Sequence, residues 1–224
     1  IGGIELIGGQ PQKQSHLALH TIKEITAAHI GIQADGDFWH GDARGFGNDS
    51  VARARHQTEA TAHDYAIAPP APTLLDWVQG AGRDTHAVGK IGDIFSMRGI
   101  GALHKGKSDA DLFDHLDRLA GDAAPGSLTF ANFVEFDSLY GHPRDVAGYA
   151  RALETFDARV GGFLARLRPG DLAIFTADHG NDPTWRGTEH TRERVPILCA
   201  GVGAGPLGLR GFVDVAASVA AHLG

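Results

Sequence analysis

The chain lacks the features that mark several specialised classes of protein. Cys199 is the only cysteine among 224 residues, which excludes an intramolecular disulfide and a zinc site built from cysteines alone. No apolar run approaches the roughly 18 residues that a membrane-spanning helix needs. The 20 lysines and arginines form no long basic run and are outnumbered by 27 acidic residues. Because phosphate binding to nucleic acid requires clustered basic residues, we expect neither a nucleic-acid nor a membrane partner.

The N-terminal sequence Ile1-Gly2-Gly3-Ile4 has neither an initiator methionine nor the charged-then-apolar pattern of a signal peptide. We therefore expect a cytoplasmic protein, with a fragment as an open alternative. The composition, 42% hydrophobic and 21% charged, is that of an ordinary globular chain of one or two domains. The 13 histidines are many for this length and weakly indicate metal or phosphate chemistry.

The pattern of the chain changes near residue 63. Residues 1–62 are rich in Gly, His, Gln and Ala and show little periodicity, with one plausible helix over 17–30. From 63 onward, segments with helical and strand patterns alternate. The expected helices are 72–79, 108–120, 145–167 and 212–223, and the expected strands are 85–88, 128–136, 172–177 and 195–200. This alternation predicts an α/β fold with a mostly parallel sheet flanked by helices.

Two of the expected strands are followed directly by metal-ligating residue types. Asp137 and His142 follow the strand 128–136, and Asp178-His179 follows the strand 172–177. His190 lies shortly before the next strand. In parallel α/β sheets the functional crevice lies beyond the carboxyl ends of the strands, so these side chains can converge. Two carboxylates and three imidazoles suit Mn²⁺ or Zn²⁺, and two such ions can clamp both oxygens of a phosphoryl transfer.

Each of these pieces has an ordinary structural reading when taken alone. An Asp and a His five residues apart are common by chance, Asp178-His179 could be a capped turn, and His190 could be a surface residue. Their joint occurrence, each next to an apolar strand, favours a shared site.

The same runs resemble a known family. Residues 132–142, 176–185 and 187–196, together with 88–95, closely resemble bacterial phosphopentomutases. The likeness covers about 63–224. It implies an alkaline-phosphatase-like core and the interconversion of ribose (or deoxyribose) 1-phosphate and 5-phosphate. The short run Thr176-Ala-Asp-His-Gly-Asn181 also fits cofactor-independent phosphoglycerate mutases, whereas the longer runs are more specific to phosphopentomutases.

The resemblance assigns roles to the candidate residues. Asp137, His142 and His190 would hold one manganese ion, and Asp178 and His179 would contribute to a second. Lys90 would meet the substrate phosphate, although without the resemblance we would interpret it as a solvated lysine. His63 and Asp64 would lie near the pentose phosphate, close to the return from a small cap domain. Sugar preference and oligomeric state are not indicated by the sequence.

The first 62 residues depart from the family pattern. The family begins with a strand that delivers an Asp ligand and then supplies a threonine that becomes phosphorylated, and neither segment is recognisable here. We therefore expect residues 1–62 to be an unassigned segment and 63–224 to be a metal-binding core that is incomplete at its N-terminus. Thr61-Ala62 stands where Asn-Arg is expected, which is what a one-base shift of the codons AAC-CGC would give. A frame-shifted N-terminal segment is thus one hypothesis.

Three further alternatives stay open at this point. The chain could come from another phosphatase of the superfamily, from a phosphoglycerate mutase, or be a non-catalytic metal-binding remnant. If the chain proves active, Thr21, Thr58 and Thr61 are the threonines to examine as a disguised nucleophile.

Overall fold

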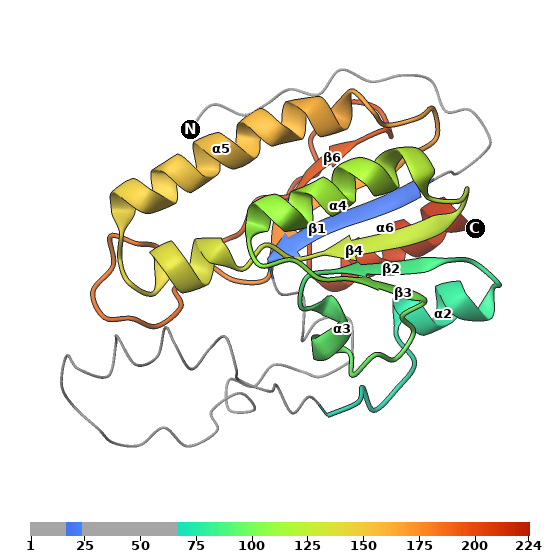
Figure 1. Cartoon of the computed structure of the whole chain (residues 1–224), viewed down its shortest axis with the longest axis horizontal. Coiled ribbons are helices and arrows are strands. Elements are labelled where there is room, and N and C mark those ends of the chain that lie inside the picture. The colour runs from blue at the N-terminus through green and yellow to red at the C-terminus, as the bar shows by residue number, and fades with distance from the viewer. Residues whose placement is uncertain (1–16, 24–66) are drawn as a thin grey trace.

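The computed structural model describes residues 17–23 and 67–224, which build a six-stranded sheet with helices on both faces (Figure 1). The strand order is β3-β2-β4-β1-β5-β6. All neighbouring strands are parallel except β6, which runs antiparallel to β5. The strands are β1 (Leu17–Lys23), β2 (Thr85–Val88), β3 (Ala102–His104), β4 (Ser127–Ala131), β5 (Leu172–Ala177) and β6 (Leu198–Ala200). The predicted mostly parallel α/β sheet is confirmed.

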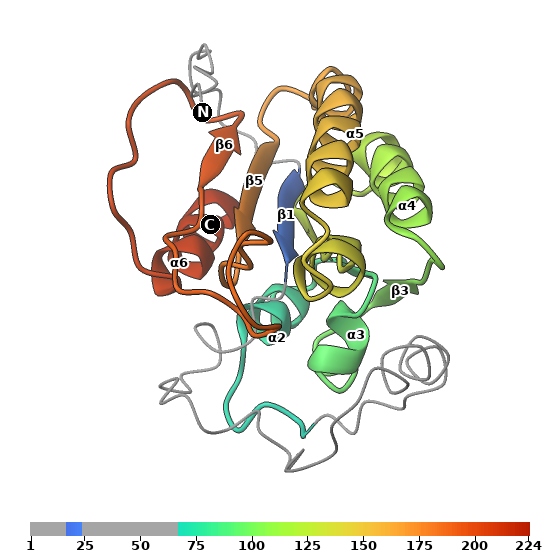
Figure 2. The same cartoon turned by 90° about the vertical axis from the view of Figure 1, so that its left-hand side faces the viewer.

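The helices lie in two layers, one on each face of the sheet (Figure 2). They are α2 (Leu74–Gly80), α3 (Ile91–Ile94), α4 (Asp109–Asp122), α5 (Val146–Leu164) and α6 (Val213–Leu223), with a π-helix, η2 (Phe136–Gly141). The helices α4 and α5 cover one face around the buried side chains of Phe113, Leu116 and Phe163. The opposite face is covered by α2 and α6, whose Leu75 and Val219 pack against the strands. Helices therefore cover the sheet on both sides, while the edge strands β3 and β6 are only partly buried.

The helix starts and the two best-defined strands agree with the sequence prediction. The side chain of Ser108 accepts a hydrogen bond from the Asp111 amide (3.2 Å) and caps α4, and Asp145 caps α5 through the Gly148 amide (2.8 Å). Such caps satisfy amides that have no partner within the helix. The strands β2 and β5 have the predicted bounds, and the first three residues of β5 and all of β2 except His86 are buried. In these elements the local sequence signals and the burial in the folded chain favour the same structure.

The helix predicted over 17–30 is wrong where the structure describes it, because 17–23 form the strand β1. This segment pairs with β4 on one side and β5 on the other. A strand between two parallel neighbours satisfies its backbone groups from both sides, which outweighs a loose helical periodicity. The β-branched Thr21 and Ile22 also favour a strand. The rest of the predicted helix lies outside the described residues.

Two predicted strands are shorter in the structure. The strand predicted over 128–136 ends at Ala131, and the chain then turns toward η2. At this turn the buried Asn132 contacts the residues that follow β2. Its backbone N–H donates to the Val88 carbonyl (3.2 Å), and its side-chain Oδ1 accepts from the backbone N–H of Lys90 (2.7 Å). The strand predicted over 195–200 begins only at Leu198. Pro196 has no N–H to donate to a ladder.

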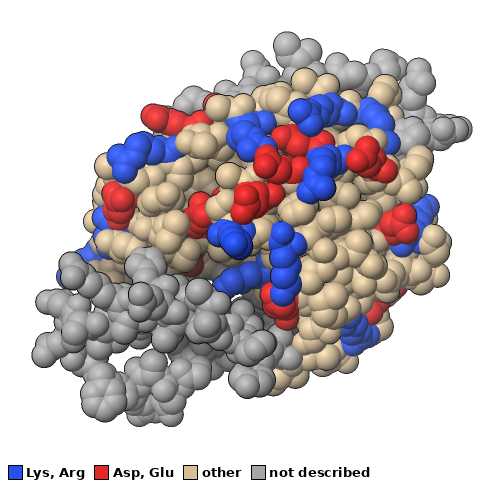
Figure 3. Space-filling model, viewed as in Figure 1, with Lys and Arg blue, Asp and Glu red and all other residues tan. Residues whose placement is uncertain are grey.

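The described surface carries charges of both signs. On the face seen in Figure 3, basic and acidic side chains lie next to one another. Between α5 and α4, Arg159 pairs with Asp114 (2.7 Å) and Asp117 (2.9 Å). Among the helices that the structure describes, none is long and apolar enough to cross a membrane.

Candidate metal centre

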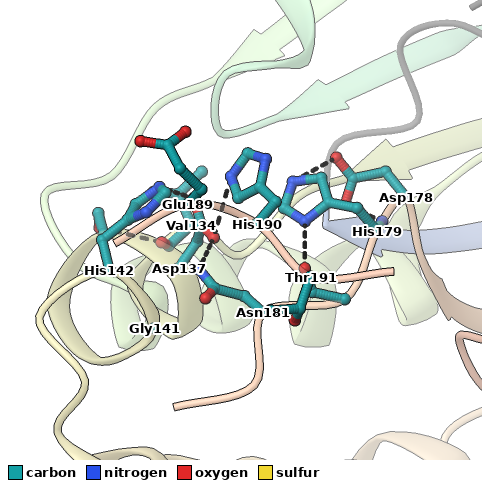
Figure 4. A network of polar contacts seen from close by, with 12 residues as sticks. Val134, Asp137, Gly141, His142, Asp178, His179, Asn181, Glu189, His190 and Thr191 are labelled. Carbon is teal, nitrogen blue, oxygen red and sulfur yellow. Dashed lines mark hydrogen bonds and ion pairs between the residues drawn. The ribbon is translucent and has the colours of Figure 1, made fainter. Parts of the chain in front are cut away.

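The first part of the centre lies in the π-helix that follows β4 (Figure 4). Asp137 is in the first turn of η2 and is 7% exposed. The His142 amide donates to the Asp137 carbonyl (2.9 Å), an i to i+5 contact that defines the π turn. The same wide turn brings the two side chains together, with His142 Nε2 3.0 Å from Asp137 Oδ2.

The second part is the turn after β5. The strand ends at Ala177, and the backbone bends at Asp178 and His179. His179 Nε2 lies 3.1 Å from Asp178 Oδ2, so both adjacent side chains serve the same crevice. Gly180 is required here for space and not for a left-handed backbone: a Cβ would lie 2.9 Å from the Thr191 carbonyl oxygen and would collide with the Glu193 carboxylate.

The third part is His190, which the segment after this turn carries back to the crevice. An isolated antiparallel bridge joins Gly180 and Thr191, whose amide donates to the Gly180 carbonyl (2.9 Å). The His190 ring stacks on His179 with centroids 3.5 Å apart, and its Nε2 lies 3.5 Å from Asp137 Oδ1. Ligand atoms of Asp137, His179 and His190 lie within 4.8 Å of one another, the one such trio in the described residues. All five predicted ligands thus come together.

The hydrogen bonds of two histidines match the pattern found in metal-ligating histidines. Nδ1 of His142 contacts the Thr188 carbonyl, and Nδ1 of His179 contacts the Gly180 carbonyl (3.2 Å). A carbonyl oxygen only accepts, so each Nδ1 carries the hydrogen, and a neutral ring then has a lone pair on Nε2. Both Nε2 atoms face carboxylate oxygens. A lone pair that faces a carboxylate is repelled unless a proton or a metal ion lies between them, and a histidine with Nδ1 on a carbonyl and Nε2 in the crevice is arranged as metal-ligating histidines are.

Several residues of the centre were not singled out from the sequence. Asn181 is buried, and its Nδ2 donates to Asp137 Oδ1. Arg144 joins the two loops of the centre through backbone carbonyls. Burial raises the pKa of the Tyr149 hydroxyl, and the negative charge of Asp137 raises it further. Asn181 lies inside a family-like run and Arg144 two residues beyond another, but their contacts depend on how the loops meet.

The predicted substrate residues are described only in part. Lys90 lies at the carboxyl end of β2, at the start of α3, and is exposed. It follows Gly89, whose φ of +80° and close approach to Asn132 exclude a side chain. His63 and Asp64 lie outside the described residues, as do Thr58 and Thr61. Thr21 lies within β1, paired with Ala131 and Phe175.

Comparison with known proteins places these observations in a family. The family described as the metalloenzyme superfamily matches residues 60–224. The phosphopentomutase of Chelativorans sp. (strain BNC1) is 56% identical over 178 residues, 77% of this chain and 44% of the relative. That of Rhizobium rhizogenes (strain K84 / ATCC BAA-868) is 51% identical over 174 residues, 76% of this chain and 43% of the relative. The chain thus spans less than half the length of these relatives.

A solved structure shows the same fold at low sequence identity. Phosphoglycerate mutase from Leishmania mexicana matches with a TM-score of 0.52 and 19% identity, over 69% of this chain and 37% of that one. The expected alkaline-phosphatase-like core is confirmed, and so is the resemblance to phosphopentomutases. On the match of residues 60–224, this chain belongs to the metalloenzyme superfamily.

Proposed function

We propose that this chain is the C-terminal part of a phosphopentomutase, which interconverts ribose (or deoxyribose) 1-phosphate and 5-phosphate. The observation that carries the proposal is the convergence of two carboxylates and three imidazoles beyond the carboxyl ends of β4 and β5. The 49–56% identity to phosphopentomutases supports the same activity. A cytoplasmic location stays a prediction.

The metal proposed for this centre is manganese, as a pair of ions. Asp137, His142 and His190 would hold one ion, and Asp178 and His179 would contribute to the other. The trio of Asp137, His179 and His190 draws on both sets, so the two ions would lie close together. The mixed oxygen and nitrogen donors suit Mn²⁺ or Zn²⁺. When bound, such ions stabilise the negative charge that develops on a transferring phosphoryl group.

The protein residues around the centre would orient the substrate and the ligands. Lys90 stands at the same edge of the sheet as the ligands, where its ammonium could bind the phosphate of a pentose phosphate. Asn181 donates to Asp137 and leaves the other carboxylate oxygen for His142 and the metal. His63 and Asp64 stay predicted substrate residues.

We further propose a limit on what the chain does alone. Residues 63–224 would form the metal-binding core, and residues 1–62 contain no threonine in a context that resembles the nucleophile of the family. Metal ions cannot replace a covalent carrier, so we expect metal binding without phosphoryl transfer. Sequencing the gene upstream of the His63 codon tests the frame-shift hypothesis, which fails if no neighbouring frame encodes the missing motifs.

A coupled assay of the purified chain tests the function. Ribose 5-phosphate is supplied with MnCl₂, and formation of ribose 1-phosphate and of free phosphate is measured, alongside calorimetric titration with Mn²⁺. We expect Mn²⁺ binding and neither product. Turnover near that of an intact mutase would show that residues 1–62 supply a nucleophile, whereas hydrolysis without isomerisation would contradict the mutase assignment and indicate a phosphatase. Absence of Mn²⁺ binding would contradict the metal centre.

A further inference from the structure

Arg144 contacts both loops of the metal centre, although it is not itself one of the candidate ligands. It lies two residues after His142, in the connection between η2 and α5. Its guanidinium donates to four backbone carbonyls and one side-chain oxygen: those of Gly141 (3.1 Å), Asp182 (2.9 Å), Gly187 and Glu189, and Oδ1 of Asn181. Four of these five acceptors belong to residues 181–189, which connect the turn after β5 to His190.

Two of these carbonyls belong to the segment that positions the candidate ligands His142 and His190. The carbonyls of Gly187 and Glu189 flank Thr188, whose own carbonyl accepts the hydrogen of His142 Nδ1. Glu189 is also the residue next to His190. Fixing this short segment therefore sets both the ring orientation of His142 and the position from which His190 enters the crevice.

The contact with Asn181 acts on the buried carboxylate. Arg144 Nη1 donates to Asn181 Oδ1, which leaves the Asn181 amide nitrogen pointing at Asp137 Oδ1. The Arg144 guanidinium thus fixes the orientation of the Asn181 side chain, so that its NH₂ group and not its oxygen faces Asp137.

The backbone of Arg144 is itself unusual. Its φ is +61°, a left-handed conformation that non-glycine residues adopt at a cost. The adjacent turn is held by backbone hydrogen bonds from Arg144 to Gly141 (3.1 Å) and from Asp145 to Tyr140 (2.9 Å). A strained residue of this kind persists where its surroundings fix it, and here the fixed group is the guanidinium.

We propose that Arg144 is the positioning residue of the metal centre: it holds segment 187–189 and Asn181 so that His142, His190 and Asp137 converge. The inference deepens the metal centre proposed above and rests on it. In this role Arg144 acts through these neighbours and is not itself a metal ligand. Arginine is suited to this role because its planar group offers five donors in a fixed geometry, which lysine cannot reproduce.

Whether substitution of Arg144 raises or lowers the Mn²⁺ affinity distinguishes a positioning role from a purely electrostatic one. Removing a positive charge near a cation site should strengthen metal binding by relieving repulsion. Removing a positioning residue should weaken it. Arg186, an exposed residue of the same connecting segment, provides a control that removes the same charge.

The test compares the full chain with the variants Arg144→Ala, Arg144→Lys, Arg144→Gly and Arg186→Ala. Mn²⁺ affinity is measured by calorimetry, and hydrogen exchange over residues 187–190 is measured by mass spectrometry in metal-free protein. We expect Arg144→Ala to weaken Mn²⁺ binding about 10- to 100-fold, as the loss of residues that orient ligands does. Arg144→Lys should be intermediate, and Arg186→Ala should bind at least as tightly as the unsubstituted chain. Exchange over 187–190 should be faster in Arg144→Ala and in Arg144→Gly, and unchanged in Arg186→Ala.

Arg144→Gly keeps the inference testable if the alanine variant does not fold. Glycine adopts the left-handed backbone without cost, so this variant keeps the turn and removes only the guanidinium. Wild-type Mn²⁺ affinity in folded Arg144→Gly or Arg144→Ala would overturn the inference while leaving the metal centre intact. If the unsubstituted chain binds no Mn²⁺, the metal centre itself fails, and the inference fails with it. Unchanged exchange over 187–190 would then also exclude a role for Arg144 in holding the segment.

A double variant shows whether Arg144 acts through the ligand that it orients. In a His142→Ala background, the further loss of affinity caused by Arg144→Ala should be smaller than in the unsubstituted chain. Equal losses in both backgrounds would contradict positioning of His142.

Discussion

Two groups of three histidines lie in the described part of the molecule, and only one of them is built like a metal site. The metal-centre histidines are His142, His179 and His190. The β3-edge histidines, from β2, β3 and α4, are His86, His104 and His115. Both groups bring imidazole rings within about 5.5 Å of one another. The difference lies in what the ring nitrogens face.

The ring nitrogens of the β3-edge histidines contact one another, a backbone carbonyl and an arginine, and none of the described contacts in this group is with a carboxylate. His86 Nδ1 lies 3.2 Å from His104 Nε2, so one ring donates to the other. His115 contacts the Lys105 carbonyl (3.0 Å) through one nitrogen and the Arg118 guanidinium through the other. In the metal centre, by contrast, each Nε2 faces a carboxylate oxygen and two Nδ1 atoms face carbonyls. The abundance of histidine is thus a weaker signal than the carboxylates beside it.

Asp137→Asn should give the largest effect and the sharpest contrast between the groups. Removal of the buried negative charge leaves His142 and His190 without their shared anionic partner, so we expect Mn²⁺ affinity to fall more than about 100-fold, beyond the usual loss for residues that only orient ligands. His104→Gln should leave Mn²⁺ affinity within about twofold. Calorimetric titration of both variants measures this. Similar losses in the two would mean that the β3-edge histidines also take part in binding.

Gly180→Ala should be the next largest effect, because the turn has no room for a methyl group. The added Cβ would press on the Thr191 carbonyl oxygen and on Glu193. We expect a loss of about 1–3 kcal/mol in the free energy of unfolding, as for other overpacked sites. Gly161→Ala in α5 is the matched control, since a Cβ there meets nothing within 4 Å. It should stabilise the chain by about 0.5–1 kcal/mol. Urea denaturation distinguishes the two, and equal responses would show that the turn can relax.

Asn181→Ala should have a smaller effect on the metal. The substitution removes the donor to Asp137 Oδ1 without removing a ligand, so we expect Mn²⁺ affinity to fall about tenfold. Thr184→Ala, in the exposed part of the same loop, should leave affinity unchanged. A wild-type affinity in Asn181→Ala would mean that Asp137 is held without its amide partner.

The smallest expected effect is the contribution of the β3-edge histidines to the pH dependence of the free energy of unfolding. Burial lowers the pKa of His86, and burial followed by the nearby positive charges of His86, His115 and Arg118 lowers the pKa of His104. Their folded pKa values thus lie below the unfolded value of about 6.5, so the unfolded chain takes up protons more readily. Their stabilising contribution is therefore complete above that value and is lost as the pH falls below it.

This pH dependence can be measured by urea denaturation of the metal-free chain between pH 7.5 and pH 5. The double variant His86→Gln/His104→Gln should lose less stability over this range than the unsubstituted chain. An equal or greater loss in the double variant would contradict the assignment of these two groups.

Much of the fold could be predicted because local and tertiary signals agree. The runs that form β2 and β5 are short, that of β5 is mainly apolar, and the run that forms α4 combines a helical apolar pattern with the N-cap Ser108. The strand β1 could not be predicted, because its conformation depends on the gap between β4 and β5 that it fills. The π-helix η2 was also missed, since an apolar run that continues past Ala131 gives no sign that the chain leaves the sheet.

The candidate ligands could be predicted, but what holds them could not. Asp137, His142, Asp178 and His179 follow two strands in the sequence, and parallel topology brings them to one edge. His190 returns to that edge through the bridge between Gly180 and Thr191. Arg144 and Asn181 make their contacts between segments about 40 residues apart, and such contacts have no local sequence pattern.

Anomalous diffraction at the manganese absorption edge, from crystals of the chain grown with MnCl₂, tests the metal centre most directly. The account predicts a peak bound by Nε2 of His142 and His190 and by the Asp137 carboxylate, with any second peak beside Asp178 and His179. A strongest peak at the β3-edge histidines, or no peak within reach of Asp137 in Mn²⁺-saturated crystals, would contradict it.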